Sequence, residues 1–365
     1  MAIIFFSSHL PSSDAPEAGQ KICLHHLEAL SQLNAVHVVS FVNAQERKYL
    51  NPRAFQKYAS AKFFSLSNMR RALNWAKNFH LPVEVAIRAD RRINKHITGL
   101  IETFSPSEIF MEYEQAAYII RRVETDAKKT LVLHDIMSQS IERRATQASA
   151  CSARRLFLKL QLRMTKSWER KIFESVDNIV VLNDKDGKLL REMGTPKAKI
   201  KIEHPCISES FLRASRGKFE WATILFWGAM NRNENEDAVL WFVEHIFPKI
   251  KSAIPEARFV VLGANPSKRI LDLSCTSISV TGYVEDPIPY FERACLMVAP
   301  LRLGAGIKIK VLEALAAKLP VIGTTVATEG IEDPDQLLTT VDDPDDFASQ
   351  VIRKLRAFRN INSLL

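Results

Sequence analysis

The chain has 365 residues, of which 47% are hydrophobic and 25% are charged, the composition of a globular protein long enough for two domains. It contains no run of 18 or more apolar residues, which excludes a helix that spans a membrane. The net charge of +9 is unevenly placed, with +13 on residues 1–218 and −4 on residues 219–365. We therefore expect the first half to meet an anionic partner.

Short apolar runs alternate with longer helical patterns along the first half. The runs predicted as strands are 3–6, 36–42, 109–112, 131–134 and 179–182. The first run has no basic residues before it and is too short for a signal peptide. Five scattered cysteines without a CxxC pair favour a reducing compartment, so we expect a cytoplasmic protein. Most of the runs are apolar without polar alternation, which is typical of strands buried on both faces of a parallel sheet.

Two basic stretches stand out in this half. Residues 52–97 carry ten Lys and Arg against two acids, and residues 142–171 form the second stretch. In the latter, apolar residues recur every four positions from 156 to 168, as on one face of a helix. Such a helix can lie on an anionic membrane or pack on a sheet with a solvated basic face, and both interpretations stay open. The residues expected to face a membrane are Arg154, Arg155, Arg163 and Lys166.

The second half repeats the alternation of strands and helices. Its predicted strands are 224–227, 258–262, 277–280, 296–299, 321–323 and 337–340. Two such series predict an α/β fold with two Rossmann-like domains facing each other across a cleft, where ligands bind beyond the carboxyl ends of the strands. The expected parts are a domain at 1–210, a linker at 211–220, a domain at 221–345, and a C-terminal helix at 346–365 that returns towards the first domain.

A glycine-rich loop follows the strand predicted at 296–299 and leads into a helix. Its sequence, VAPLRLGAGIKIKVLEALA, combines backbone amides and a helix dipole with Arg302, Lys308 and Lys310, which favours a phosphate group. The loop lacks the third glycine of a dinucleotide fingerprint and the GK[ST] of a Walker A loop. Scattered cysteines without a CxxC pair, and Asp-Pro-Asp segments typical of turns, give no reason to expect a metal.

Taken in order and spacing, the segments of the second half resemble the retaining glycosyltransferases of the GT-B fold, family 4. The matching pieces are GAMNRNENEDAVLWF, VTGYVEDPIPYF, the glycine-rich loop with its helix, PVIGTT and TEGI. The first half resembles this family more loosely, through LPSSDAPEAGQ, EYEQAAY, LHDIMS and WERKIFESVDNIVVLND. The resemblance covers roughly a hundred residues of the second half and is more specific than any single glycine motif.

The resemblance implies a nucleotide-diphosphate-sugar donor, held mainly by the C-terminal domain, and no cofactor. Glu313 would bind the ribose, and the loop after the third strand would bind the base. The residues implied in donor binding are Gly19, Gly228, Arg232, Gly263, Gly282, Tyr283, Val284, Gly304, Ala305, Gly306, Ile307 and Glu313. Those implied in catalysis are His134, Asp135, Arg302 and Lys308. His134 ends a predicted strand, where structural hydrogen bonding is the alternative.

The chain departs from the family pattern at two places. Ala305 replaces the first glutamate of an E-x7-E pair, and Ala229 and Glu234 stand near the usual Arg and Lys. The implied activity is a metal-independent hexosyltransferase that acts with retention on a polysaccharide or lipid-linked glycan. The alternative is a non-catalytic GT-B-like partner or carbohydrate-binding protein. The implied location is peripheral, on the inner face of the cell membrane. Nothing resembles a nucleic-acid-binding motif.

Overall fold

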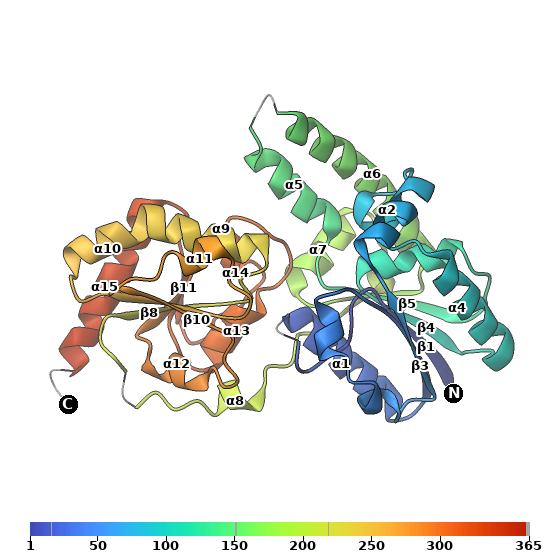
Figure 1. Cartoon of the computed structure of the whole chain (residues 1–365), viewed down its shortest axis with the longest axis horizontal. Helices are drawn as coiled ribbons and strands as arrows, with labels where there is room; N and C mark the ends of the chain where they lie inside the picture. Colours follow the sequence, from blue (N-terminus) through green and yellow to red (C-terminus); the bar gives the residue numbers. More distant parts are fainter. Residues whose placement is uncertain (16, 150–151, 218, 363–365) are drawn as a thin grey trace. The chain divides into compact units, whose positions relative to one another are not determined.

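The computed structural model describes residues 1–15, 17–149, 152–217 and 219–362. The chain divides into two compact units, the first ending at His204 and the second beginning at Pro205. Each unit is built on one parallel sheet (Figure 1). The last three residues of the predicted C-terminal helix, 363–365, lie outside the described residues.

The sheet of the first unit has, within the described residues, the strand order β3-β2-β1-β4-β5-β6-β7, and all neighbours are parallel. The strands are β1 (Ala2–Ser7), β2 (Ala35–Val42), β3 (Ser60–Ser65), β4 (Glu108–Glu112), β5 (Lys128–Leu133), β6 (Asn178–Val181) and β7 (Ile200–Ile202). Parallel pairing buries both faces of the central strands, which explains their continuous apolar sequence.

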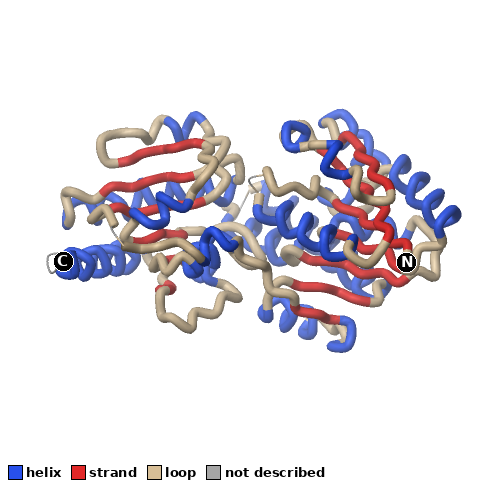
Figure 2. The backbone as a smooth tube through the Cα atoms, turned by 90° about the horizontal axis from the view of Figure 1, so that it is seen from below, coloured by secondary structure: helices blue, strands red, loops and turns tan. Residues whose placement is uncertain are grey.

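Helices connect these strands and flank the sheet (Figure 2). They are α1 (Ala18–Ser31), α2 (Asn68–Lys77), α3 (Val83–Ala86), α4 (Arg91–Phe104), α5 (Met137–Gln147), α6 (Ala153–Ser175) and α7 (Asp184–Glu192), with 3-10 turns at Glu46–Tyr49, Pro52–Phe55, Glu114–Arg121 and Lys197–Lys199. Several helices begin at a side chain that accepts a backbone N–H: Ser67 caps α2, Asp90 caps α4, Ser152 caps α6 and Asn183 caps α7.

The second unit repeats this design with the strand order β10-β9-β8-β11-β12-β13, again all parallel among the described residues. The strands are β8 (Thr223–Trp227), β9 (Arg258–Leu262), β10 (Ile278–Gly282), β11 (Leu296–Ala299), β12 (Val321–Gly323) and β13 (Leu338–Thr340). The helices are α8 (Glu209–Leu212), α9 (Asn233–Trp241), α10 (Phe247–Ala253), α11 (Lys268–Leu271), α12 (Ile288–Arg293), α13 (Ile309–Ala316), α14 (Thr325–Thr328) and α15 (Pro344–Asn362), with a π-helical turn at Phe242–Ile246.

Each unit has its own hydrophobic core. In the second unit the core includes Phe347, Val351 and Leu355 of α15, and this helix packs against α10. These three side chains of α15 therefore pack within the core of the second unit.

The predicted strands are present, with ends that move by up to three residues. The strand predicted at 131–134 ends at Leu133, so His134 is the first residue beyond it. The sequence analysis missed β3 and β7, which are the two edge strands of the first sheet and are largely exposed. No helix in the described part of the chain is long and apolar enough to cross a membrane.

Candidate functional site

Two glycine turns meet at the carboxyl ends of neighbouring strands in the second unit. Gly228 follows β8 and Gly263 follows Leu262, the last residue of β9, and Gly228 N donates to the carbonyl of Leu262 at 3.0 Å. A Cβ atom on Gly263 would lie 1.9 Å from the carbonyl oxygen of Gly228. That distance is shorter than any non-bonded contact, so only glycine fits at this position. The structure therefore brings these two predicted donor residues together.

The glycine-rich loop before α13 is held by Lys308. Its Nζ donates to the carbonyl oxygens of Ala305 at 3.1 Å and Gly306 at 2.5 Å, and the side chain is buried. Gly304 lies beside it, since a Cβ there would be 3.7 Å from Lys308 Cε. The first amides of α13 have no acceptor within the helix, so this end of α13 favours an anion. The ammonium group of Lys308, however, is engaged by the loop itself.

The two arginines predicted near the loop have acidic partners. Arg302 Nη2 lies 2.6 Å from Asp237 Oδ1 of α9, and its guanidinium lies 5.3 Å from the ring centre of Trp241. Arg232 forms an ion pair with Glu234. Burial alone would raise the pKa of Glu234, but the Arg232 guanidinium lowers it below the usual value. These partners reduce the positive charge that either arginine offers to a ligand.

Lys310, in the first turn of α13, lies beneath the Gly228 turn. Its Nζ donates to Asn235 Oδ1 at 2.5 Å and lies 4.8 Å from the ring centre of Phe226. A Cβ on Gly228 would be 2.7 Å from Nζ. Burial is the main cause that lowers the pKa of Lys310 to about 7, and Arg232 is the next largest. A buried amine therefore lies between the two loops predicted to bind the donor.

Glu313 lies further along α13 and is fixed by Trp227 of β8. The indole Nε1 of Trp227 donates to Glu313 Oε2 at 2.7 Å. Both side chains are half-buried. This bond ties the glutamate predicted to bind ribose to the last residue of β8.

The residues predicted to bind the base lie at the end of β10, whose last residue is Gly282. Gly282 has a φ of 72°, in the region that favours glycine, with open space where a Cβ would be. Tyr283 is exposed, and Val284 packs against the core. An exposed ring at the end of a strand offers a surface for stacking, and the role of these residues stays a prediction.

In the first unit, Glu112 at the end of β4 joins two histidines. Its Oε1 lies 2.6 Å from His26 Nδ1, and its Oε2 lies 2.7 Å from His134 Nε2. Glu112 is fully buried, and burial alone would raise its pKa, but the two imidazoles lower it to about 2. Burial opposes the charged form of His26, yet Glu112 raises the pKa of that ring above its usual value.

His134 also stacks on Tyr113, the residue that follows β4. The ring centres are 3.9 Å apart and nearly parallel. Tyr113 has a φ of 68°, a strained value for a residue other than glycine, of the kind found at functional sites. A Cβ on Gly19 would lie 2.8 Å from Tyr113 Oη and 3.2 Å from His134 Nδ1. Two residues predicted separately, Gly19 and His134, are therefore neighbours.

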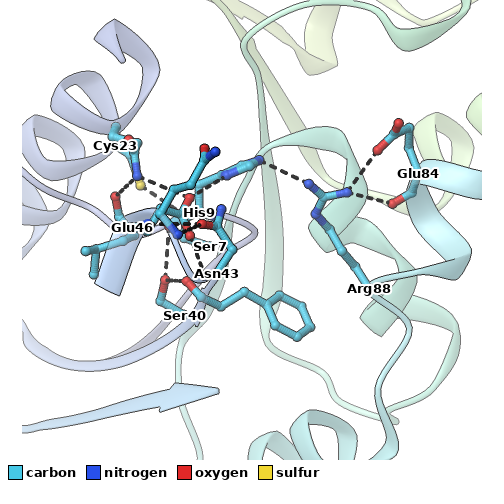
Figure 3. A network of polar contacts seen from close by, with 12 residues as sticks. Ser7, His9, Cys23, Ser40, Asn43, Glu46, Glu84 and Arg88 are labelled. Atoms are coloured by element: carbon cyan, nitrogen blue, oxygen red, sulfur yellow. Dashed lines mark hydrogen bonds and ion pairs between the residues drawn. The ribbon is translucent and has the colours of Figure 1, made fainter. Parts of the chain in front are cut away.

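A second histidine, His9, also contacts the ring of Tyr113 and was missed by the sequence analysis. The ring centres of His9 and Tyr113 are 4.8 Å apart. His9 Nδ1 lies 2.8 Å from Glu46 Oε1, and Arg88 Nη2 lies 3.3 Å from His9 Nε2 (Figure 3). Arg88 is held in turn by Glu84 at 3.1 Å. Polar groups therefore gather where β1, β4 and β5 end.

One sequence signal could have identified this cluster. His9 and Tyr113 both come shortly after predicted strands, as His134 does, and the carboxyl ends of parallel strands lie at one edge of a sheet. The partners Glu46 and Arg88 lie on segments outside the predicted strands, and no spacing in the sequence connects them to His9. Asp135 follows His134 and is half-buried, and its charge raises the pKa of the buried Glu114.

The basic helix predicted near residues 156–168 is α6, and it is divided along its length. Trp168 is buried in the core of the first unit, whereas Leu156, Phe157 and Leu160 are exposed. With α5, the exposed half extends away from the sheet (Figure 1). Of the four basic residues predicted to face a membrane, Arg154 and Arg163 are exposed, Arg155 is half-buried, and Lys166 pairs with Glu142 at 3.1 Å.

In the described ranges, no three His, Cys, Asp or Glu residues are grouped as metal ligands. The arrangement instead offers backbone amides, a buried amine and a glutamate in the second unit. The first unit offers a carboxylate-held histidine. Such groups bind and orient polar, anionic ligands.

Comparison with known proteins gives a family match within the second unit and a match of fold over the whole chain. Residues 222–357 match the family model of glycosyl transferases group 1. No curated protein sequence matches the chain. The fold is similar to that of sucrose-phosphate synthase from Thermosynechococcus elongatus, with a TM-score of 0.66 and 16% identity over 98% of this chain and 90% of that chain.

Two further solved structures have the same architecture. HepE of Anabaena in complex with UDP-glucose has a TM-score of 0.60 and 12% identity over 98% of this chain and 91% of that chain. A glycosyltransferase from Rickettsia africae has a TM-score of 0.62 and 11% identity over 98% and 89%. The likeness confirms the predicted fold, an α/β chain of two Rossmann-like domains of the GT-B type.

Proposed function

We propose that the protein is a glycosyltransferase that moves a sugar, with retention and without a metal, from a nucleotide-diphosphate sugar to a polysaccharide or lipid-linked glycan. The observation that carries this proposal is the site around α13. The glycine turns and the start of α13 with Lys310 meet there, and Glu313 lies on the same helix. The site lies within the segment that matches glycosyl transferases group 1.

The transfer reaction requires stabilisation of the diphosphate as it leaves. In our proposal the amides at the start of α13 bind the diphosphate, and Glu313 accepts hydrogen bonds from the ribose hydroxyls. Lys308 acts by fixing the loop through the carbonyls of Ala305 and Gly306. His134 and Asp135 are proposed to contact the substrate, with His134 oriented by Glu112.

Removing the carboxylate of Glu313 tests the donor site. Glu313→Ala is expected to weaken binding of the donor by about 1–3 kcal/mol, the usual contribution of hydrogen bonds to a charged group. Affinity is measured by calorimetry with whichever of UDP-, GDP-, ADP- and TDP-glucose raises the melting temperature most.

Trp227→Phe is the matched control, because it removes the indole N–H that holds Glu313 but keeps the carboxylate. It is expected to have a smaller effect than Glu313→Ala. Unchanged donor affinity in a folded Glu313→Ala protein would refute the assignment of Glu313.

A second candidate function is a non-catalytic GT-B-like partner or carbohydrate-binding protein. The specific observation in its favour is Ala305, which provides a backbone carbonyl to Lys308 and no carboxylate. Turnover or slow hydrolysis of the bound donor distinguishes the two. Donor binding without any release of nucleotide, with a range of glycan acceptors, would support the non-catalytic role.

We also propose that the protein works at the inner face of the cell membrane, in peripheral contact with anionic lipid. Support comes from the exposed half of α6, where Leu156, Phe157 and Leu160 lie near Arg154 and Arg163. Apolar side chains flanked by basic ones are the pattern of a helix that lies in a membrane interface.

A further inference from the structure

Four basic residues surround the proposed donor site, and they differ in what they bind. Arg302 pairs with Asp237, and Arg232 pairs with Glu234. Lys308 Nζ donates to two carbonyl groups of its own loop. The hydrogen-bond partner of Lys310 Nζ is the neutral amide oxygen of Asn235 at 2.5 Å. The two arginines are therefore paired with acids, whereas both lysines donate to neutral oxygens, and Lys310 lies in the first turn of α13 itself.

The surroundings of Lys310 hold the amine without neutralising it. Asn235 is fixed by its own hydrogen bond, from Nδ2 to the carbonyl of Ala229 at 2.7 Å. The ring of Phe226 lies 4.8 Å from Nζ. Nζ also packs against the backbone of Gly228, where a Cβ would lie only 2.7 Å from it. The amine therefore lies directly beside the turn that the sequence predicts to bind the donor.

The charges around Lys310 come from both neighbouring segments. Arg232 and Glu234 belong to the start of α9, and Lys308 and Glu313 belong to α13 and its cap. Burial is the largest influence on Lys310 and opposes the ammonium form, and the two cations act in the same direction. With the site empty, a neutral amine avoids an unpaired charge in a buried position.

We propose that Lys310 is the charge-matching residue of the diphosphate site and that it takes up a proton when a nucleotide-diphosphate sugar binds. The inference rests on the proposed function and specifies which residue supplies the cation. An anion within about 4–6 Å of the amine favours the ammonium form, so donor binding and protonation strengthen each other. Since burial lowers the pKa of Lys310 to about 7, donor affinity is expected to fall as the pH rises above that value.

Proton uptake on binding is measured by calorimetry in buffers with different ionisation enthalpies. The probe is whichever of UDP-, GDP-, ADP- and TDP-glucose gives the largest thermal shift. A nucleotide sugar is chosen over the free diphosphate because a terminal phosphate itself titrates near pH 6. For the wild type at pH 7 we expect an uptake of about half a proton, as for a group half protonated before binding.

Two substitutions separate the charge from its titration. Lys310→Arg keeps a permanent cation, so proton uptake should disappear while affinity becomes nearly independent of pH. Lys310→Met removes the cation, so affinity should fall at least about tenfold and proton uptake should disappear. Lys318→Arg is the matched control, at an exposed lysine that pairs with Asp335, and it should retain the uptake of the wild type.

A measurement without ligand tests the amine directly. In the protein labelled with carbon-13 at lysine Cε, one resonance should titrate with a midpoint near pH 7, and it should be missing in Lys310→Arg. Donor binding without proton uptake, or uptake that persists in Lys310→Arg, would overturn the inference and leave the proposed function intact. If none of the nucleotide sugars binds, the proposed function fails, and with it the role of Lys310 in binding.

Discussion

Glu112 shows how a single buried carboxylate can determine the chemistry of a neighbouring histidine. With a pKa of about 2, Glu112 is ionised at neutral pH and can only accept hydrogen bonds. His134 therefore carries its proton on Nε2, the nitrogen that faces Glu112. The other nitrogen, Nδ1, lies on the side of Gly19. The carboxylate thus leaves Nδ1 as the nitrogen of His134 that can accept a hydrogen bond from the proposed substrate.

Replacing Glu112 tests this arrangement. A glutamine can donate as well as accept, so Glu112→Gln loosens the choice of tautomer in His134 while keeping the volume of the side chain. We expect turnover to fall at least about tenfold, or 1.4 kcal/mol of barrier, and the pH profile of the reaction to shift. Donor affinity should stay within about twofold, because the proposed donor site lies in the second unit.

The control for this variant is His26→Gln, which removes only the other partner of Glu112. It should affect turnover less than Glu112→Gln does. Wild-type turnover and an unchanged pH profile in Glu112→Gln would assign Glu112 a purely structural role.

At the scale of elements, two buried carboxyl groups hold the start of α5. They belong to Glu114, in the 3-10 turn after β4, and to Glu169 of α6. Met137 N donates to Glu114 Oε2 at 3.0 Å, and Ser138 N donates to Glu169 Oε1 at 2.7 Å. Burial is the main cause that raises the pKa of both groups, to about 7 for Glu169, and the charge of Glu169 raises that of Glu114 further. The pair therefore keeps a proton at pH values where exposed carboxylates have lost theirs.

This pair predicts a pH dependence of stability. The folded protein binds a proton that the unfolded chain releases, so the free energy of unfolding falls as the pH rises from about 4.5 to 7. For Glu169 alone the loss is at most about 3 kcal/mol. Glu169→Gln should flatten this slope in urea unfolding measured between pH 5 and pH 8. The exposed Glu142→Gln on α5 should leave it unchanged, and an equal slope in both variants would contradict the prediction.

The exposed half of α6 carries the prediction for the membrane. Changing Leu156, Phe157 and Leu160 to serine should reduce binding to vesicles containing phosphatidylglycerol at least about tenfold, because apolar burial in the interface is lost. The side chains are exposed, so the fold should survive. Leu271→Ser, at an exposed leucine of the second unit, is the control.

A second variant distinguishes the electrostatic contribution to vesicle binding from the hydrophobic one. Removing Arg154 and Arg163 should abolish the dependence of vesicle binding on salt, since basic residues act through the anionic surface. Vesicle binding that survives the triple serine change would refute the proposed surface. Binding to neutral vesicles as strongly as to anionic ones would refute the choice of lipid.

The central strands of the sheets could be predicted from the sequence, and the edge strands of the first sheet could not. Strands such as β1 and β8 are buried on both faces and therefore read as unbroken apolar runs. The edge strands β3 and β7 carry lysines and exposed positions, as edge strands do to resist association, and this pattern resembles that of loops.

In the candidate sites, likewise, some residues could be predicted from the sequence and their partners could not. Gly19, Gly228, Gly263 and Glu313 follow from a local motif and a resemblance. The partners that hold them come from other parts of the chain: Trp227 for Glu313, and Tyr113 for Gly19. These contacts depend on the order of strands in the sheet, which places β4 beside β1. No spacing along the chain expresses that order.

At the scale of the whole molecule, each unit has a main hydrophobic core of its own. Two cores allow two unfolding transitions, and a ligand stabilises only the unit that binds it. A nucleotide sugar at 100 times its dissociation constant should stabilise the second unit by about 2.7 kcal/mol. Hydrogen exchange should show this protection in β8 and β11 and leave β1 and β5 unchanged. Equal protection of both units would contradict the proposed position of the donor site.

The contact between Gly263 and the carbonyl of Gly228 determines which mutations of the gene can be tolerated at this codon. Every single-base change in a glycine codon is either silent or encodes a stop or a residue that carries a Cβ atom. At Gly263 that atom would lie 1.9 Å from backbone, which no rotation of a side chain can relieve. Gly282 differs, because the space around it is open and only its φ disfavours other residues. We expect a library of random mutants to retain some amino-acid changes at codon 282 and none at codon 263.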